Sequence, residues 1–286
     1  MSGFIPYLNK RRAFIMQSLG LTAIYLLNPF KLFSQQKTEK IKMIQIQKKI
    51  EQFNTAIFNG KFIVNKPVAS GFSKSIAPYS NLFYWSHAIA LDDCEFGLHP
   101  HEGFEIMTFI LEGQVTHFDT ASKVWTPLET GDFQVIQSNK GIQHQERIAK
   151  GTRSFQIWFD PNFQKALKQN PAYVDYHSKD YETVIENEIK TTTYIGGHSV
   201  AYAMTPYLTI KKLTFDNQTK TSLQLDSNCS YTFYVLSGSG LADTQQIKKD
   251  DAIRLSNTQQ LDIEFTGELF YIQTPTQLDY KSVWTA

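Results

Sequence analysis

Short apolar segments separated by turn residues recur along the chain. In the first half, the apolar run 82–90 ends before Asp92, and the run 105–111 ends before Gly113. Asn59-Gly60 lies between two further apolar runs, and this dipeptide is a strong signal for a tight hairpin. Many short strands at such spacing are typical of an antiparallel sandwich or barrel, not of alternating strands and helices. We therefore predict an all-β protein.

The second half of the chain repeats the pattern of the first. The segment 231–238 parallels the segment 106–113, and the segment 248–255 parallels the segment 129–136. An internal repeat of one structural unit indicates two similar domains. We therefore expect two antiparallel β-barrels.

The clearest helical segment lies between the two halves, at residues 162–169. We expect a short helix there that links the barrels. The predicted organisation is an N-terminal segment at 1–36, a first barrel at 37–165 and a second barrel at 166–286.

Composition narrows the classes of partner. The net charge is +1, and the lysines are scattered, so the chain has no electrostatic footprint for nucleic acid. The aromatic content, with 21 Phe and 14 Tyr, favours strands, because aromatic side chains pack well on pleated surfaces. Cys94 and Cys229 are expected to stay unpaired. We expect a monomer that acts on a small molecule.

Residues 1–36 have the features of an export signal. Arg11 and Arg12 precede Phe14 and the moderately apolar run 19–27, an order similar to that of a twin-arginine signal. The run is shorter than the about 20 apolar residues that a membrane span needs. We expect a periplasmic protein, which a retained signal would anchor in the membrane. The alternative is an amphipathic N-terminal helix on a cytoplasmic protein.

Four potential metal ligands lie in two short motifs, His99-Pro-His101 and His144-Gln-Glu146. In each motif the two ligands are one residue apart, and alternate residues of a strand face the same side. Two such strands facing each other would bring three imidazoles and one carboxylate together. This set suits a divalent transition metal and leaves about two of six coordination positions for water, substrate or oxygen. The pattern predicts an open, catalytic metal site.

The same motifs carry a family resemblance. The segment 99–113, with its HPHxGFE and LEG elements, and the GxxHxE segment 141–146 resemble the pirin family of bicupins. The resemblance implies two barrels of the jelly-roll type, also called double-stranded β-helices. It also implies that one metal is bound by His99, His101, His144 and Glu146. Glu105, which other cupins use as a ligand, would then be a supporting or catalytic carboxylate.

The pirin resemblance also implies a function. It indicates a metal-dependent dioxygenase that opens a flavonol such as quercetin, or a similar aromatic substrate, with O2. The expected cofactor is one divalent transition metal, with iron(II) first and manganese, nickel, copper or zinc as alternatives. Glu146 or Glu105 would take the proton of the substrate hydroxyl. Two other classes stay open: a metal-binding regulatory or interaction protein without catalysis, and a non-oxidative cupin isomerase or lyase.

The second barrel is predicted to lack a metal site. The positions that correspond to His99 and His101 fall on Gln224 and Asp226, and no histidine follows Tyr202.

Other residues of the first barrel have two interpretations. His87 and His117 lie on predicted strands outside the motif spacing, and we interpret them as core or surface residues. Five apolar residues are candidates for a cavity wall, with barrel core as the alternative for each. They are Phe104, Phe109, Phe133, Ile136 and Phe155.

Overall fold

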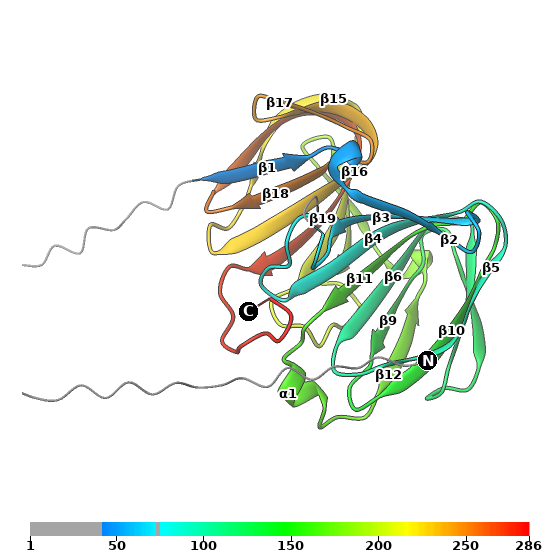
Figure 1. The fold of residues 1–286 in the computed structure, drawn as a ribbon. Coiled ribbons are helices and arrows are strands. Elements are labelled where there is room, and N and C mark those ends of the chain that lie inside the picture. Colours follow the sequence, from blue (N-terminus) through cyan, green and yellow to red (C-terminus); the bar gives the residue numbers. More distant parts are fainter. Residues whose placement is uncertain (1–41, 73–74, 286) are drawn as a thin grey trace, which may run out of the picture. The chain divides into compact units, whose positions relative to one another are not determined.

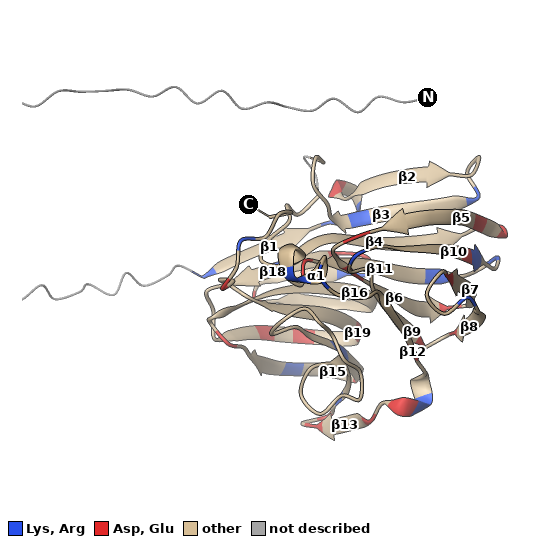
Figure 2. Ribbon diagram, turned by 90° about the horizontal axis from the view of Figure 1, so that it is seen from below, with Lys and Arg blue, Asp and Glu red and all other residues tan. Residues whose placement is uncertain are grey.

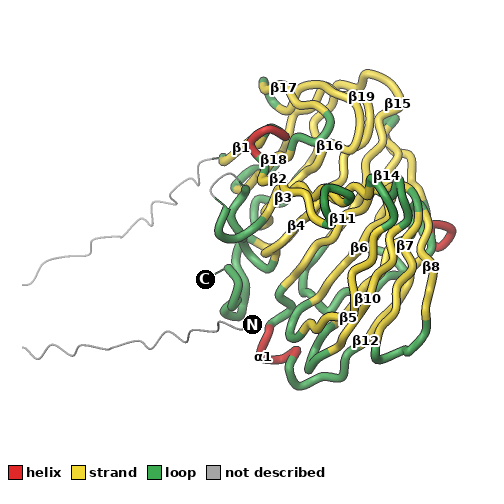
Figure 3. The backbone as a smooth tube through the Cα atoms, turned by 45° about the vertical axis from the view of Figure 1, so that its right-hand side comes forward, coloured by secondary structure: helices red, strands yellow, loops and turns green. Residues whose placement is uncertain are grey.

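The computed structural model describes residues 42–72 and 75–285. Nearly all the regular secondary structure of these residues is antiparallel β-strand (Figure 3). The prediction of an all-β protein is confirmed. The export signal predicted at 1–36 lies outside the described residues. Within the described part of the chain, no helix is long and apolar enough to cross a membrane.

The first half of the described chain folds into two sheets (Figure 1). The smaller sheet has the order β5-β10-β7-β8 and the larger has the order β12-β9-β6-β11-β4-β3-β2. The smaller sheet consists of β5 (Cys94–His101), β7 (Gln114–Asp119), β8 (Trp125–Glu129) and β10 (Ile142–Ile148). The larger consists of β2 (Phe53–Ile57), β3 (Phe62–Val68), β4 (Leu82–Ala90), β6 (Glu105–Glu112), β9 (Phe133–Gln137), β11 (Arg153–Phe159) and β12 (Ala172–Tyr176).

The second half forms a single sheet with the order β1-β18-β16-β19-β15-β14-β13, and β17 pairs with β16. Its strands are β1 (Met43–Gln47), β13 (Thr183–Glu186), β14 (Ile189–Ile195), β15 (Thr209–Gln224), β16 (Cys229–Ala242), β17 (Gln245–Lys248), β18 (Ala252–Ser256) and β19 (Gln260–Pro275). The register shifts between Phe215 and Thr219 and between Val235 and Ser237. Such bulges bend long strands, and here the sheet curves around its own apolar core.

The internal repeat predicted from sequence is visible in strand pairing. β6 pairs with β9 in the first half, and β16 pairs with β18 in the second. The turn glycines that follow the repeated motif also match, because Gly113 and Gly238 both have φ of 82°. A Cβ at Gly238 would lie 1.8 Å from the Thr266 carbonyl oxygen, so this close strand crossing requires glycine.

The predicted boundary at residue 165 does not separate the strands of the sheets, because each half contributes a strand to a sheet of the other half. β1, near the start of the described chain, pairs with β18 of the second half. β12, which follows the boundary, pairs with β9 of the first half. The two halves therefore exchange strands. The boundaries 37–165 and 166–286 stay a prediction.

The helical segments are short. α1 (Phe163–Ala166) follows the first half, and the Asn162 side chain accepts a hydrogen bond from the Lys165 amide at its start. The 3-10 turns η1 (Lys49–Glu51) and η2 (Ser178–Asp180) precede β2 and β13. Basic and acidic residues are interspersed over both halves (Figure 2), in agreement with the near-zero net charge.

Candidate metal centre

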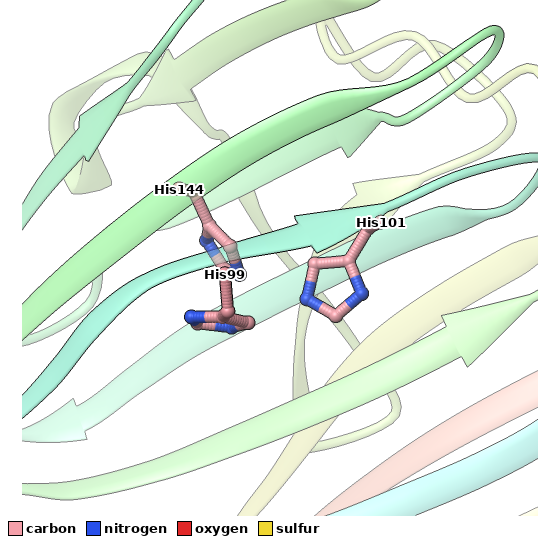
Figure 4. Close-up of side chains that lie close together, drawn as sticks. All are labelled: His99, His101 and His144. Carbon is pink, nitrogen blue, oxygen red and sulfur yellow. The ribbon is translucent and has the colours of Figure 1, made fainter. Parts of the chain in front are cut away.

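Three of the predicted metal ligands come together on two paired strands. β5 and β10 are antiparallel neighbours, and His144 lies opposite His99 in their register. The candidate ligand nitrogens of His99, His101 and His144 all lie within 4.8 Å of one another. Figure 4 shows the three imidazoles grouped beside the two strands. We call this group the histidine cluster.

A bulge in β5 places the histidine pair. His144 pairs with His99, but Glu146, two residues on, pairs with Phe96, three residues back. The extra residue in β5 shifts the alternation of side chains, so Phe96, His99 and His101 all line the same cavity. Bulges commonly re-aim side chains beside functional sites.

Hydrogen bonds fix the orientation of two of the rings. His99 Nδ1 lies 2.8 Å from the carbonyl oxygen of Gly97, and His144 Nδ1 lies 3.2 Å from His117 Nε2. With Nδ1 engaged in each ring, Nε2 is the nitrogen that can offer a lone pair to an ion. His144 Nε2 is buried and has no hydrogen-bond partner among the described residues. A buried polar atom without a partner fits a missing ligand.

The electrostatics of the cluster favour neutral imidazoles. Burial, reinforced by the neighbouring His99 ring, lowers the pKa of His101 to about 4. Burial and the other rings lower the pKa of His144 to about 2. Neutral imidazoles are the form that binds transition metals. The histidine cluster therefore fits a divalent transition metal.

Glu146 lies beside the cluster but outside the group of atoms within 4.8 Å. It is buried, lines the same cavity as His99 and His101, and its carboxylate accepts a 3.5 Å hydrogen bond from Gln156 Nε2. Burial raises the pKa of Glu146 to about 7. Its assignment as the fourth ligand stays a prediction.

Glu105 is not among the grouped ligand residues of the histidine cluster. Its carboxylate accepts hydrogen bonds from the amides of Met204 and Thr205 at 2.6 and 2.8 Å, from the Thr205 hydroxyl at 2.5 Å, and from Gln137 Nε2 at 3.2 Å. The carboxylate thus ties the second half of the chain to the first. The role of Glu105 as a supporting or catalytic carboxylate at the metal stays a prediction, and in this structure its oxygens are engaged by these four donors.

A cavity of about 280 Å³ adjoins the histidine cluster. The aromatic part of its wall consists of Phe62, Tyr84, Phe96 and Trp158. The wall candidates that sequence suggested lie in apolar cores instead. Phe109, Phe133 and Phe155 pack in a core shared with the second half, and Phe104 and Ile136 pack in a smaller one.

A larger open cleft of about 1220 Å³ lies apart from the histidines, where η1 approaches β17. Two of the lysines that line it, Lys48 and Lys49, pair with Asp251 and Asp250. Since none of the clustered histidines lines this cleft, size alone does not make it the site of the metal chemistry.

Sequence reasoning missed the role of His117. This residue is fully buried, contacts His144, and stacks on Tyr173 with ring centroids 4.5 Å apart. The burial pattern of β7 alternates, with Val115, His117 and Asp119 on the buried face. The sequence alone does not show this face, because the apolar Phe118 lies on the partly exposed side and the polar His117 and Asp119 lie on the buried side.

The second half supplies no comparable cluster. Among the described residues, the histidine cluster is the group found with metal-ligand geometry. The interior of the second half is filled by large apolar side chains, including Phe215, Phe233 and Phe265. The lack of a metal site in the second barrel stays a prediction.

Comparisons with known proteins place the site in a family context. The pirin family model matches residues 67–159. A Zymomonas mobilis protein named provisionally as a quercetin 2,3-dioxygenase is 44% identical over 99 residues, which cover 34% of this chain and 41% of that protein. The quercetin 2,3-dioxygenase of Escherichia coli K12 is 40% identical over 70 residues, 23% of this chain and 29% of that protein. The matched part thus spans less than half the length of these curated relatives.

Solved structures resemble the fold over a longer range. The nickel(II) complex of the bacterial pirin YhhW from Escherichia coli has a TM-score of 0.66 at 19% identity, covering 82% of this chain and all of that chain. A quercetin 2,3-dioxygenase from Acinetobacter baumannii has a TM-score of 0.69 at 19% identity, covering 82% and 79%. At this identity the likeness shows the fold, which is that of the pirins.

Proposed function

We propose, on the premise that residues 67–159 form a pirin-family domain, that the protein is a metal-dependent dioxygenase acting on a flavonol or a similar aromatic compound. The observation that carries the proposal is the histidine cluster beside a cavity walled by aromatic side chains. Such a site combines positions for a metal with apolar surface for a flat ligand. The names of the Zymomonas and Escherichia relatives support the same reaction class.

The histidine cluster would hold the metal, with Glu146 as the fourth ligand. When bound, a divalent transition metal, with iron(II) first and manganese, nickel, copper or zinc as alternatives, would supply Lewis acidity and, if redox-active, a site for oxygen chemistry. In His99 and His144, the contacts at Nδ1 hold each ring so that Nε2 is free to bind the metal.

Glu146 is the residue that we assign to proton transfer. Its carboxylate is buried at the cavity and accepts a hydrogen bond from Gln156 at one oxygen, so an oxygen stays available for a substrate hydroxyl. Without a metal, burial raises the pKa of Glu146 to about 7, and a bound cation would lower that pKa and keep the carboxylate ionised. Glu105 is not assigned this role, because its oxygens accept four hydrogen bonds elsewhere.

The aromatic wall would orient the substrate. Tyr84 and Trp158 stack with ring centroids 4.4 Å apart, and Trp158 lies 5.5 Å from the His101 ring. A flat ligand lying along these rings would point one of its edges at the histidine cluster. Of the three histidines, His144 is buried, whereas His99 and His101 are partly exposed on the cavity side, where a ligand can reach them.

Oxygen uptake tests this proposal. The full chain, reconstituted separately with iron, manganese, nickel and copper, is given a flavonol, and uptake is compared with that of the His101→Ala variant. Uptake that depends on the metal and is lost in the variant supports the dioxygenase. No uptake with a filled site favours a metal-binding interaction protein or a non-oxidative cupin enzyme.

The role of Glu146 needs its own variant. A metal-loaded Glu146→Gln protein should lose turnover, because the amide cannot accept the substrate proton. Normal turnover by that metal-loaded variant would exclude Glu146 as the base.

A further inference from the structure

Lys66 lies on the wall of the cavity that adjoins the histidine cluster. Its ammonium stands over three aromatic rings, 5.6 Å from the centroid of Phe53, 5.3 Å from that of Phe72 and 5.2 Å from that of Tyr84. Ring faces attract cations, so the three rings hold the ammonium in place. They offer its N–H groups no strong acceptor.

Local structure explains how a lysine reaches this wall. Phe62, Val64 and Lys66 alternate along β3, and all three line the cavity. Phe53 is the cross-strand partner of Lys66 on β2. The pairing of β3 with β4 is irregular between Asn65 and Val68, so Lys66 lies within this irregular stretch.

No described residue neutralises the charge of Lys66 through an ion pair. Among the ion pairs and hydrogen bonds of residues 42–72 and 75–285, none involves the Lys66 ammonium. It is also the one lysine or arginine among the described residues that line this cavity. Burial lowers the pKa of Lys66 from its usual range, which shows a desolvation cost without a compensating carboxylate. An anion supplied from outside would offset that cost.

The aromatic wall connects Lys66 to the histidine cluster. Tyr84 contacts the ammonium, Trp158 stacks on Tyr84 at 4.4 Å, and His101 lies 5.5 Å from Trp158. A flat ligand along this wall would have one end at the histidines and the other end toward the ammonium. The cavity volume of about 280 Å³ lies at the small end of ligand sites, which suits a single ring with a short acidic side chain.

We propose that Lys66 is a specificity-determining residue that binds an anionic group of the substrate, so that the cavity takes aromatic acids with two neighbouring hydroxyls. The inference rests on the proposed function, because it assumes that an aromatic substrate meets the histidine end with its oxygens. It goes further by assigning a carboxylate to the opposite end of that substrate. Such an ion pair in a partly buried site gives both affinity and selectivity.

Paired probes test the ion pair without catalysis. The full chain is loaded with zinc, which has no redox chemistry, and binding is measured by calorimetry for 3,4-dihydroxybenzoate and 3,4-dihydroxycinnamate. Each acid is compared with its neutral amide, which keeps the ring, the diol and the shape. We expect the preferred acid to bind roughly tenfold more tightly than its amide, a factor that corresponds to about 1.4 kcal/mol.

Three variants separate the charge from the fold. Lys66→Met keeps an unbranched stem against the three rings and should reduce the acid preference to near unity, with amide binding unchanged. Lys66→Arg should keep the preference. Lys61→Met is the matched control, because Lys61 precedes the same strand and pairs with exposed Asp92. Equal binding of acid and amide by the unaltered protein for both probe lengths, or an undiminished preference in Lys66→Met, would overturn the proposal.

The two proposals fail in different ways. Acid preference is an equilibrium property of the zinc-loaded protein, so a protein without oxygen uptake can still show it. Conversely, uptake with a neutral flavonol and no acid preference would retain the dioxygenase and reject the role of Lys66.

Discussion

His117 Nε2 lies 3.2 Å from Nδ1 of His144, and the two rings come from the neighbouring strands β7 and β10. A proton on His144 Nδ1 would be shared with His117, which leaves Nε2 of His144 with its lone pair. His117 thus supports a proposed metal ligand without belonging to the ligand motif.

We predict that His117→Phe weakens metal binding without abolishing it. Phenylalanine preserves the stacking on Tyr173 but removes the nitrogen that orients His144. Loss of such an outer hydrogen bond typically lowers metal affinity about 10- to 100-fold. Competition with a chromophoric chelator would measure the change. His198→Phe, at an exposed histidine, is the matched control, and equal affinities in both variants would reject the supporting role.

His101→Ala should have a stronger effect. Removing one of three clustered imidazoles weakens the proposed set of four ligands, whereas His101 is half-buried on the cavity side and its loss should leave the strands intact. The expected result is an unchanged far-ultraviolet circular dichroism spectrum with metal content well below one per chain. A variant that purifies with full metal occupancy would contradict the ligand assignment.

The histidine cluster could be predicted because strand alternation is a short-range rule. His99 and His101 share a face through their spacing, and GxxHxE supplied a second strand at a recognisable distance in sequence. The β5 bulge could not be predicted, since it depends on pairing with β10. Lys66 was missed for a similar reason, because its three ring contacts come from residues on other segments.

The position of Glu105 shows the limit of arguing from a motif. Its place in the HPHxGFE run suggested a role at the metal, but the residues that bind it, Met204 and Thr205, lie about a hundred positions along the chain. Sequence spacing carries no signal for such a contact. The repeat of strands was easier to predict, since the two halves of the sequence contain similar short segments.

We predict that Glu105→Gln destabilises the fold and leaves metal binding intact. The amide group would place N–H donors against the backbone amides of Met204 or Thr205 in a fully buried position. A buried donor without an acceptor costs about 1–3 kcal/mol. Denaturant unfolding of the variant should show a loss of this size, with the same metal content as the unaltered protein.

Thr205→Ala is a milder change at the same contact, and its loss of stability can be compared with that of Glu105→Gln. It removes the hydroxyl donor alone and leaves both amide donors on the carboxylate, so its cost should be about 1 kcal/mol. If Glu105→Gln instead retained full stability but lost metal, Glu105 would act at the histidine cluster after all.

His87 makes the stability of the fold depend on pH. Its Nδ1 lies 2.9 Å from the hydroxyl of Tyr234 on β16, so the contact joins the two halves of the chain. Burial lowers the pKa of His87 from 6.5 to about 4, although Asp250 nearby opposes the shift. The unfolded chain therefore binds a proton that the folded chain does not bind. Stability should fall as the pH drops from about 6.5 to about 4, at up to about 1.4 kcal/mol per pH unit for this proton.

His87→Gln should flatten this part of the pH profile. Glutamine can keep a neutral hydrogen bond to Tyr234 but cannot take up the proton. Denaturant unfolding of the metal-free protein at several pH values between 7 and about 4.5 would give the slope for each form. Other histidines with lowered pKa values, such as His101 and His144, contribute to both profiles, so the difference between the two slopes isolates His87. The control variant His198→Gln, at an exposed histidine, should have the same slope as the unaltered protein. If His87→Gln also had that slope, His87 would bind its proton equally in the folded and unfolded protein, and the prediction would be wrong.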